Sequence, residues 1–188
     1  VLEAIDVAAD AGLGPIKVNA VIKRGVNEHA VLEMADHFRG TGHIVRFIEY
    51  MDVGNTNGWR LDDVVAAEEM IAGIDQVFPL EPVPPNYPGE VANRFRYLDG
   101  AGEIGVIASV TKPFCGSCTR ARVSAEGSLY TCLFASSGTS LRDTIRGGGD
   151  IGLVIDEVWS KRDDRYSEIR SANTSRMAVP VEMSYIGG

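Results

Sequence analysis

The sequence predicts an α/β fold built from two unlike parts. Helix and strand patterns alternate over residues 1–78, which is the order expected of a parallel sheet or of a (β/α) barrel segment. A segment with five prolines, residues 79–89, interrupts this order. Patterns of hairpins and short helices follow it. We therefore expect late βα units in residues 1–78 and a second, α+β region in residues 79–188.

The first part opens with an amphipathic helix, and Gly12 is placed to end it. Its apolar face consists of Leu2, Ile5, Ala8 and Ala9. Because the chain begins inside this helix and without an initiator methionine, we expect it to be the C-terminal part of a longer protein. Residues 15–22 follow as a near-continuous apolar strand, of the kind found buried in parallel sheets.

A second helix and strand continue the alternation. Asn27 is placed to cap the helix. Residues 43–51 form the next strand, and a loop rich in glycine and asparagine follows at residues 52–59. In α/β barrels this carboxyl end of the strands carries the active site. Asp62 is then expected to cap a further helix that extends through Gly73.

The second part begins with the proline-rich residues 79–89, which predict irregular structure because proline removes backbone donors. Two hairpins follow. The first joins residues 94–98 to residues 103–110, and the second turns at Glu126–Gly127. The helices expected after them are a short one that begins at Ser140 and a longer one over residues 150–161.

The overall composition disfavours several classes of protein. The chain carries a net charge of −8 and has a sequence pI near 4.9, which argues against a nucleic-acid-binding surface. No apolar run is long enough to predict a membrane span. Three cysteines are an odd number for a secreted disulfide scaffold, and no signal-peptide pattern is present. We therefore expect a reducing, cytoplasmic compartment.

All three cysteines lie within residues 113–132. Cys115 and Cys118 form a CxxC pair on one tight loop, and Cys132 follows at the end of the second hairpin, which can return it to the same place. This set is typical of a zinc site, a redox pair or an iron–sulfur cluster. A [4Fe–4S] cluster with three cysteine ligands leaves one iron open to a substrate heteroatom. A degenerate zinc knuckle and plain buried thiols are the alternatives.

A structural zinc site takes four protein ligands, so three cysteines need a fourth partner. The histidines, His29, His37 and His43, all lie far upstream in the first part of the chain. Two of them lie on or beside a helix whose other residues are typical of packing and solvent faces. This position disfavours them as zinc ligands.

Basic residues indicate where an anion would bind. Arg120 and Arg122 follow Cys118, and strand alternation places both on one face. Two guanidiniums there form a fork for an anion or a purine, and solvent-facing arginines are the alternative. Lys17 and Arg46 lie within apolar strands, where a buried cation needs a partner. A phosphate ligand would serve, and an internal salt bridge is the alternative.

Four stretches of the sequence, taken together and in order, resemble one family. They are KVNAVIKRGVNEHAV, RFIEYMDVGNTNGW, FCGSCTRARVSAEGSLYTCLF and the terminal MSYIGG. These stretches resemble the GTP 3′,8-cyclases of molybdenum cofactor biosynthesis, the protein A family of that pathway, within the radical S-adenosylmethionine superfamily. The resemblance extends from about residue 1 to residue 188.

The resemblance implies an incomplete (β/α)6 TIM-like barrel followed by a cluster- and GTP-binding region, here residues 79–188. It implies a lyase with two [4Fe–4S] clusters. One cluster, held by an N-terminal CxxxCxxC, binds S-adenosylmethionine and generates a radical that abstracts hydrogen from C3′ of GTP, after which C3′ bonds to C8. The implied partners are GTP, S-adenosylmethionine, a second subunit in a homodimer, and cyclic pyranopterin monophosphate synthase as the next enzyme.

The resemblance also assigns cofactor contacts to residues of this chain. Cys115, Cys118 and Cys132 match the ligands of the second [4Fe–4S] cluster. The open iron of that cluster would accept a guanine nitrogen, so the substrate would take the fourth position. Met51, at the end of its strand, matches a position beside S-adenosylmethionine.

Substrate contacts are implied in the same way. Arg120 and Arg122 match positions that contact GTP. Lys17 and Arg46 match cationic positions near the phosphates. The tail, Gly187 and Gly188, matches a terminus that reaches into the active site and is needed for turnover, although a Gly-Gly end would otherwise be interpreted as an ordinary flexible terminus.

The sequence departs from the family pattern in one respect. It contains no CxxxCxxC motif, so the radical-generating half is missing, and we expect the chain alone not to catalyse the reaction. Two other functions stay open. One is a non-catalytic zinc or iron–sulfur binding module on the same scaffold, which would have no use for the four cations. The other is a radical enzyme of the same superfamily that acts on a peptide, although such enzymes lack the Gly-Gly tail.

Overall fold

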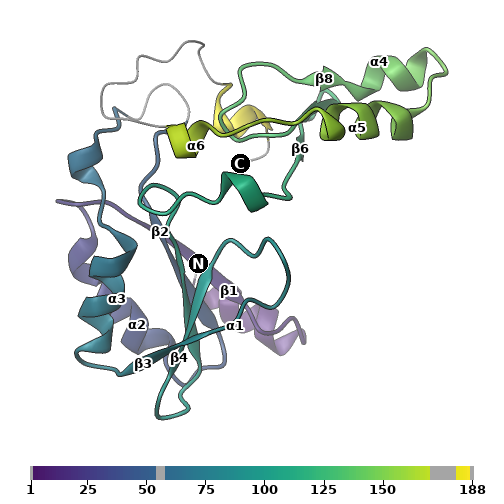
Figure 1. Ribbon diagram of the computed structural model, residues 1–188. Coiled ribbons are helices and arrows are strands. Elements are labelled where there is room, and N and C mark those ends of the chain that lie inside the picture. Colours follow the sequence, from purple (N-terminus) through teal and green to yellow (C-terminus); the bar gives the residue numbers. More distant parts are fainter. Residues whose placement is uncertain (1, 54–57, 170–180, 187–188) are drawn as a thin grey trace. The chain divides into compact units, whose positions relative to one another are not determined.

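The computed structural model describes residues 2–53, 58–169 and 181–186. Two compact units are present, Val1–Met51 with Leu61–Pro113, and Asp52–Arg60 with Phe114–Gly188 (Figure 1). The boundary expected near residue 78 lies inside the first unit and remains a prediction. No helix in the described ranges is long and apolar enough to cross a membrane.

The first unit contains one mixed sheet, which confirms the α/β class. Its strands, in the spatial order β1-β2-β5-β4-β3, are β1 (Lys17–Ile22), β2 (Ile44–Glu49), β5 (Glu103–Ile107), β4 (Asn93–Tyr97) and β3 (Leu80–Val83). β1, β2 and β5 are parallel, and β4 and β3 continue the sheet in antiparallel pairs. The predicted βαβ unit and the predicted hairpin after residue 93 are both present.

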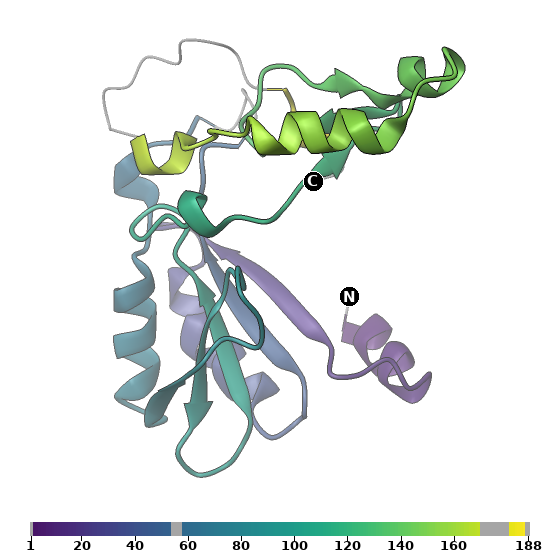
Figure 2. The same ribbon diagram turned by 45° about the vertical axis from the view of Figure 1, so that its right-hand side comes forward.

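Helices cover one face of this sheet. They include α2 (Val31–Phe38) and α3 (Ala67–Asp75), which lie together on that face in Figure 2. The other helices of this unit are α1 (Leu2–Asp10) and the 3-10 helices η1 (Glu28–Ala30) and η2 (Leu61–Asp63). As predicted, Gly12 follows α1 with a positive φ of 79°, a conformation that favours glycine.

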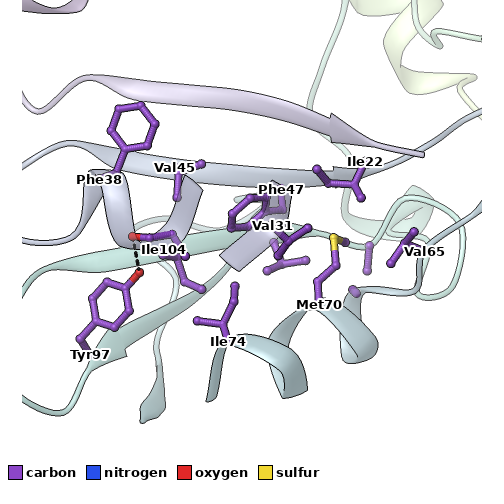
Figure 3. Close-up of a cluster of buried hydrophobic side chains, with 14 residues drawn as sticks. Ile22, Val31, Phe38, Val45, Phe47, Val65, Met70, Ile74, Tyr97 and Ile104 are labelled. Carbon is purple, nitrogen blue, oxygen red and sulfur yellow. Dashed lines mark hydrogen bonds between the residues drawn. The ribbon is translucent and has the colours of Figure 1, made fainter. Parts of the chain in front are cut away.

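The hydrophobic core fills the space between the sheet and these helices. Phe47 of β2 and Ile74 of α3 are fully buried in it, and Figure 3 shows them in one cluster with Met70 and Ile104. Truncating a buried phenylalanine to alanine typically lowers stability by about 3–5 kcal/mol. The core therefore fixes the strands of the first unit in register.

The proline-rich segment is not irregular throughout, which corrects the expectation for residues 79–89. Residues 80–83 form β3, and Pro82 lies opposite Phe95 of β4. β3 is the last strand of the sheet that the described residues form. Proline is tolerated on such an edge because its missing N–H need not serve a second neighbour.

Two predicted helix caps were wrong in detail. The side-chain oxygen of Asn27 accepts a hydrogen bond from the Lys23 N–H at 2.8 Å, and its amide donates to the Val21 carbonyl at 2.9 Å, so it shapes the preceding turn. Asp62 lies in η2, and α3 begins only after Ala66. In both places a 3-10 turn intervenes before the α-helix.

The second unit carries a three-stranded antiparallel sheet of β6 (Arg122–Val123), β7 (Ser128–Tyr130) and β8 (Thr139–Ser140). The predicted hairpin at Glu126–Gly127 is confirmed, with Gly127 at a φ of 82°. The remaining elements are η3 (Cys115–Ser117), α4 (Leu141–Arg146), α5 (Ile151–Ser160), α6 (Tyr166–Ile169) and η4 (Met183–Ile186).

The helices predicted to begin at Ser140 and to extend over residues 150–161 are present as α4 and α5, and a side chain caps each of them. The Ser140 hydroxyl accepts a hydrogen bond from the Asp143 N–H at 3.1 Å, and the Asp150 carboxylate accepts one from the Gly152 N–H at 2.7 Å. Each satisfies a donor that the helix itself leaves free. α4 and α5 lie side by side as a helical hairpin (Figures 1 and 2).

Candidate functional site

Strand alternation gives the sheet of the first unit two different faces. Val18 and Ala20 pack against the core with Ile22, whereas Lys17 and Asn19 are exposed on the other side of β1. The continuous burial expected for residues 15–22 was therefore wrong. The face away from α2 and α3, which we call the polar face, carries Lys17, Asn19, Arg46, Arg94, Arg96 and Glu103.

Arg46 lies in the middle of the polar face. It is directly opposite Asn19 in register, and its Nε donates to Asn19 Oδ1 at 2.8 Å. Gly105 flanks it on β5, where an added Cβ would approach Arg46 Cγ to 3.1 Å. The side chain thus lies flat across the glycine. It has no carboxylate partner within the described ranges.

Lys17 shares the polar face with Arg46. It is exposed at the first position of β1, two residues before Asn19, and no described residue forms a hydrogen bond or ion pair with its side chain. Met51 lies beyond the opposite, carboxyl end of the strands, two residues after β2. The structure therefore brings together the two predicted phosphate-binding cations and places Met51 apart from them.

Glu49 is a buried acidic residue that the sequence analysis missed. It is fully buried at the carboxyl end of β2. Its carboxylate accepts hydrogen bonds from the backbone N–H groups of Ala67, Val110 and Thr111 at 2.7–2.8 Å, and from the Thr111 hydroxyl. It joins β2, the start of α3 and the segment after β5. The signal was available, since an acidic residue in an apolar strand needs partners.

In the second unit, η3 holds the CxxC pair on a tight turn. The Cys118 N–H donates to the Cys115 carbonyl at 3.2 Å, and the Gly116 N–H donates to the Glu168 carboxylate at 2.9 Å. All three cysteines are free and half-buried. Cys132 lies two residues after β7, the strand that pairs with β6.

Basic side chains surround the thiol of Cys118. Arg120 Nε donates to Cys118 Sγ at 3.3 Å, and the Arg120 guanidinium also lies over the Phe114 ring at 4.8 Å. Burial acts to raise the pKa of the Cys118 thiol, but hydrogen bonds from the Arg120 backbone and from the Arg162 and Arg120 side chains outweigh it and lower the pKa. The thiol of Cys118 is therefore more readily deprotonated than that of a free cysteine.

Cys132 has a different environment. Burial raises the pKa of its thiol, and the hydrogen bond from the Phe134 N–H to Cys132 Sγ, at 3.4 Å, opposes this only in part. Phe134 is held in turn by Tyr166, whose ring stacks on it with centroids 4.4 Å apart. A cationic centre bound to the thiols would offset the burial and favour the thiolate.

The two predicted arginines do not both lie on a strand, because β6 begins only at Arg122. Arg120 precedes β6, and the loop conformation turns its side chain to Cys118. Arg122 is half-buried opposite Tyr130. Burial lowers the pKa of its guanidinium, the charge of Arg120 lowers it further, and the neighbouring Cys132 and Cys118 raise it. Both arginines thus lie in the surroundings of the thiols.

A cavity of about 550 Å³ opens beside the CxxC loop. One wall is residues 115–119, and the other extends from Trp159, near the end of α5, into the segment after it with Arg162 and Asp164. Sequence analysis did not single out this second wall. In the sequence this wall is a run of charged residues after a helix, a pattern that is typical of an ordinary solvated surface.

A family model described as Molybdenum Cofactor Synthesis C matches residues 43–168, which include all three cysteines and the two predicted arginines, Arg120 and Arg122. The chain belongs to the Molybdenum Cofactor Synthesis C family. The whole chain is 54% identical to a GTP 3′,8-cyclase from Acidothermus cellulolyticus and covers 59% of it. It is 52% identical to the GTP 3′,8-cyclase of Xanthomonas campestris pv. campestris strain B100 and covers 56% of that protein. The chain thus spans somewhat more than half the length of these relatives.

The donor set of this Molybdenum Cofactor Synthesis C chain fits an iron–sulfur cluster. In the described ranges no three His, Cys, Asp or Glu residues are close enough together to hold one metal ion. In a [4Fe–4S] cluster, however, each thiolate binds a different iron, so the ligands need not converge on one point. Cys115 and Cys118 line the open cavity, Cys118 accepts a hydrogen bond from Arg120, and the charge of Cys115 acts on Cys132, so this donor set is compatible with such a cluster.

The tail predicted to reach the active site, Gly187 and Gly188, lies outside the described residues. Just before it, Ile186 is fully buried and the Tyr185 hydroxyl donates to the Glu126 carboxylate at 2.5 Å. The last described turn of the family member is therefore tied to the second hairpin.

Proposed function

We propose that the chain is the GTP-binding part of a GTP 3′,8-cyclase of molybdenum cofactor synthesis. One observation carries this proposal. Most of the lysines and arginines that the structure describes pair with a carboxylate. The cations matched to GTP contacts have no such partner within the described ranges, and they are Lys17, Arg46, Arg120 and Arg122.

The ion pairs on the polar face show the difference between paired and unpaired arginines most clearly. Arg94 pairs with Glu103 and Arg96 pairs with Glu81, although both lie on the same face as Arg46. Among the described residues, the Arg46 side chain forms a hydrogen bond only with the neutral side chain of Asn19. A partly desolvated cation without a counter-charge favours the binding of an anion. A triphosphate supplies several anionic oxygens.

The resemblance to the family supplies a proposed role for each site residue. Cys115, Cys118 and Cys132 would hold a [4Fe–4S] cluster, which when bound supplies an open iron for a guanine nitrogen. Arg120 and Arg122 would bind the nucleotide near the thiols, and Lys17 and Arg46 its phosphates.

The remaining features of the proposal belong to the complete enzyme. They are the lyase reaction, the incomplete barrel, the binding of S-adenosylmethionine near Met51, the role of Gly187 and Gly188, the homodimer and the transfer of product to cyclic pyranopterin monophosphate synthase. The chain lacks the CxxxCxxC motif, and we propose that it is inactive alone. Three free cysteines support our proposal of a reducing, cytoplasmic compartment.

Anaerobic iron–sulfur reconstitution of the chain, followed by iron and sulfide analysis and GTP titration, tests the proposal. We expect about four irons per chain and a change in the cluster spectrum on adding GTP. ATP at the same concentration serves as the control for nonspecific phosphate binding. Zinc in place of iron, with no response to GTP, would leave a structural metal module and refute the cyclase assignment.

A further inference from the structure

The segment after α5 holds the CxxC loop at two points. The Arg162 Nη1 donates to the Cys118 carbonyl, and the Glu168 carboxylate accepts the Gly116 N–H at 2.9 Å. These contacts join residues that are distant in sequence. One is made at Gly116, inside the CxxC turn, and the other at Cys118, where the motif ends. The segment therefore restrains the turn directly through its backbone.

Arg162 is itself held on three sides. Its Nε donates to Asp164 Oδ2 at 3.1 Å, and its guanidinium lies over the Trp159 ring at 4.8 Å. Only 11% of its side chain is exposed. Burying a cation is unfavourable unless its donors are satisfied, and here a carbonyl, a carboxylate and an aromatic face satisfy them. The position of its charge is consequently well defined.

The neighbouring Lys161 shows that the helix end does not require this arrangement. Lys161 pairs with Glu157 one turn earlier on the exposed surface, and 73% of its side chain is accessible. It ends α5 without touching the cysteine loop. The buried position of Arg162 therefore needs an explanation beyond the helix terminus, and its partner at Cys118 provides one.

We propose that Arg162 is a positioning residue that holds the CxxC turn in its ligand geometry and places a fixed positive charge beside the iron–sulfur cluster. This inference rests on the proposed function, because it assumes that the cluster binds at the three cysteines. Partners outside the ligands orient them and set the reduction potential of a cluster through charge, hydrogen bonds and exposure. A fixed cation stabilises the reduced cluster, which is the more negative form.

The test compares Arg162→Gln, Arg162→Lys and the control Lys161→Gln in the full chain after anaerobic reconstitution. The readouts are the iron retained against a chelator and the midpoint potential of the cluster, neither of which needs turnover. We expect Arg162→Gln to lose iron about tenfold faster, within the range typical of such outer partners. At a fixed potential we also expect about a tenfold lower ratio of reduced to oxidised cluster, equivalent to ~59 mV for one electron.

Arg162→Lys separates the two parts of the role. It keeps the charge but loses the planar fork, so we expect faster iron loss with a nearly unchanged potential. If circular dichroism shows that Arg162→Gln does not fold, the comparison of Arg162→Lys with the unsubstituted chain still tests the positioning role through the rate of iron loss. Iron loss and potential equal to those of Lys161→Gln would overturn the inference, as would an equal shift of potential in both Arg162 variants. Failure of the unsubstituted chain to bind a cluster would instead refute the proposed function.

Discussion

Glu49 and Thr111 join the end of one parallel strand to the segment that follows another. The Glu49 carboxylate accepts the Thr111 backbone N–H at 2.8 Å and also its hydroxyl, inside the fully buried end of β2. The same carboxylate accepts the first N–H of α3, from Ala67. One side chain thus satisfies backbone donors from two other elements that would otherwise be buried without partners.

Replacing Glu49 by glutamine is expected to destabilise the first unit by about 1.5–3 kcal/mol, the range for hydrogen bonds to charged groups. Either orientation of the new amide turns its NH2 group toward a backbone N–H. Urea unfolding followed by circular dichroism measures the loss, and hydrogen exchange at Val110 and Thr111 reports it locally. Glu68→Gln, which breaks an exposed pair with Lys112, is the matched control and should change neither. Equal effects of the two substitutions would contradict the role given to Glu49.

The unpaired cations of the polar face predict a selective loss of nucleotide binding. Arg46→Gln should weaken GTP binding by the cluster-loaded chain about tenfold or more, because it removes a charged hydrogen bond to phosphate. Arg96→Gln removes the same charge from the same face, but Arg96 already pairs with Glu81, so we expect little change. Isothermal titration measures both. A similar loss in the two variants would show a general effect of surface charge.

Tyr97 predicts a loss of stability at alkaline pH. Burial raises the pKa of Tyr97 to about 12, with Arg39 acting to lower it and Asp36 to raise it. In the unfolded chain a tyrosine titrates near 10. Between pH 10 and pH 12 the unfolded state binds fewer protons than the folded state. The stability that the neutral phenol contributes is therefore complete below about pH 10 and is lost as the pH rises toward 12.

Tyr97→Phe provides the measurement for this pH dependence. The folded Tyr97 hydroxyl donates to the Ala35 carbonyl at 3.2 Å, the bond drawn as a dashed line in Figure 3, so its removal should cost about 1 kcal/mol at neutral pH. Above pH 10 the difference between the two proteins in urea unfolding should shrink. A constant difference up to pH 12 would show that Tyr97 does not titrate as its burial predicts.

Gly127 is expected to be critical for the hairpin that carries Cys132. Its φ of 82° is unfavourable for other residues by about 1–2 kcal/mol, and an added Cβ would approach Arg142 Cβ to 3.0 Å. Gly148 has a similar φ of 71° but open space around it. We therefore expect Gly127→Ala to destabilise the second unit more than Gly148→Ala. Both tryptophans, Trp59 and Trp159, belong to this unit, so their fluorescence follows its unfolding. If the two substitutions destabilise the unit equally, the side chain of Arg142 moves away from the added Cβ at little cost in free energy.

Local sequence signals predicted most elements of the fold. The helices that begin near Ser140 and Asp150, the turn at Gly127 and the βαβ unit all depend on residues close in sequence, and the structure confirms them. The failures have a different origin. Whether residues 15–22 are buried on both sides depends on what covers each face, and a strand at residues 80–83 depends on a distant partner, β4.

The candidate site shows the same division. Spacing alone identified the cysteines and the neighbouring Arg120 and Arg122. Arg162 and Glu168 contact the CxxC turn from far along the chain, and no local pattern marks a residue as the partner of a distant carbonyl or N–H. Glu49 was visible as a charge in an apolar strand, but its three backbone partners were not.

Pro82 has a consequence for how this sheet meets other proteins in solution. The Leu98 N–H donates to the Pro79 carbonyl, and in an antiparallel pair hydrogen-bonded positions alternate, so the backbone nitrogen of Pro82 is directed to the outer side of β3. That nitrogen carries no hydrogen. An incoming strand from another molecule would find a donor missing from the row, with Pro84 and Pro85 just beyond it. The segment that looked incompatible with a sheet therefore protects this border of the sheet against aggregation.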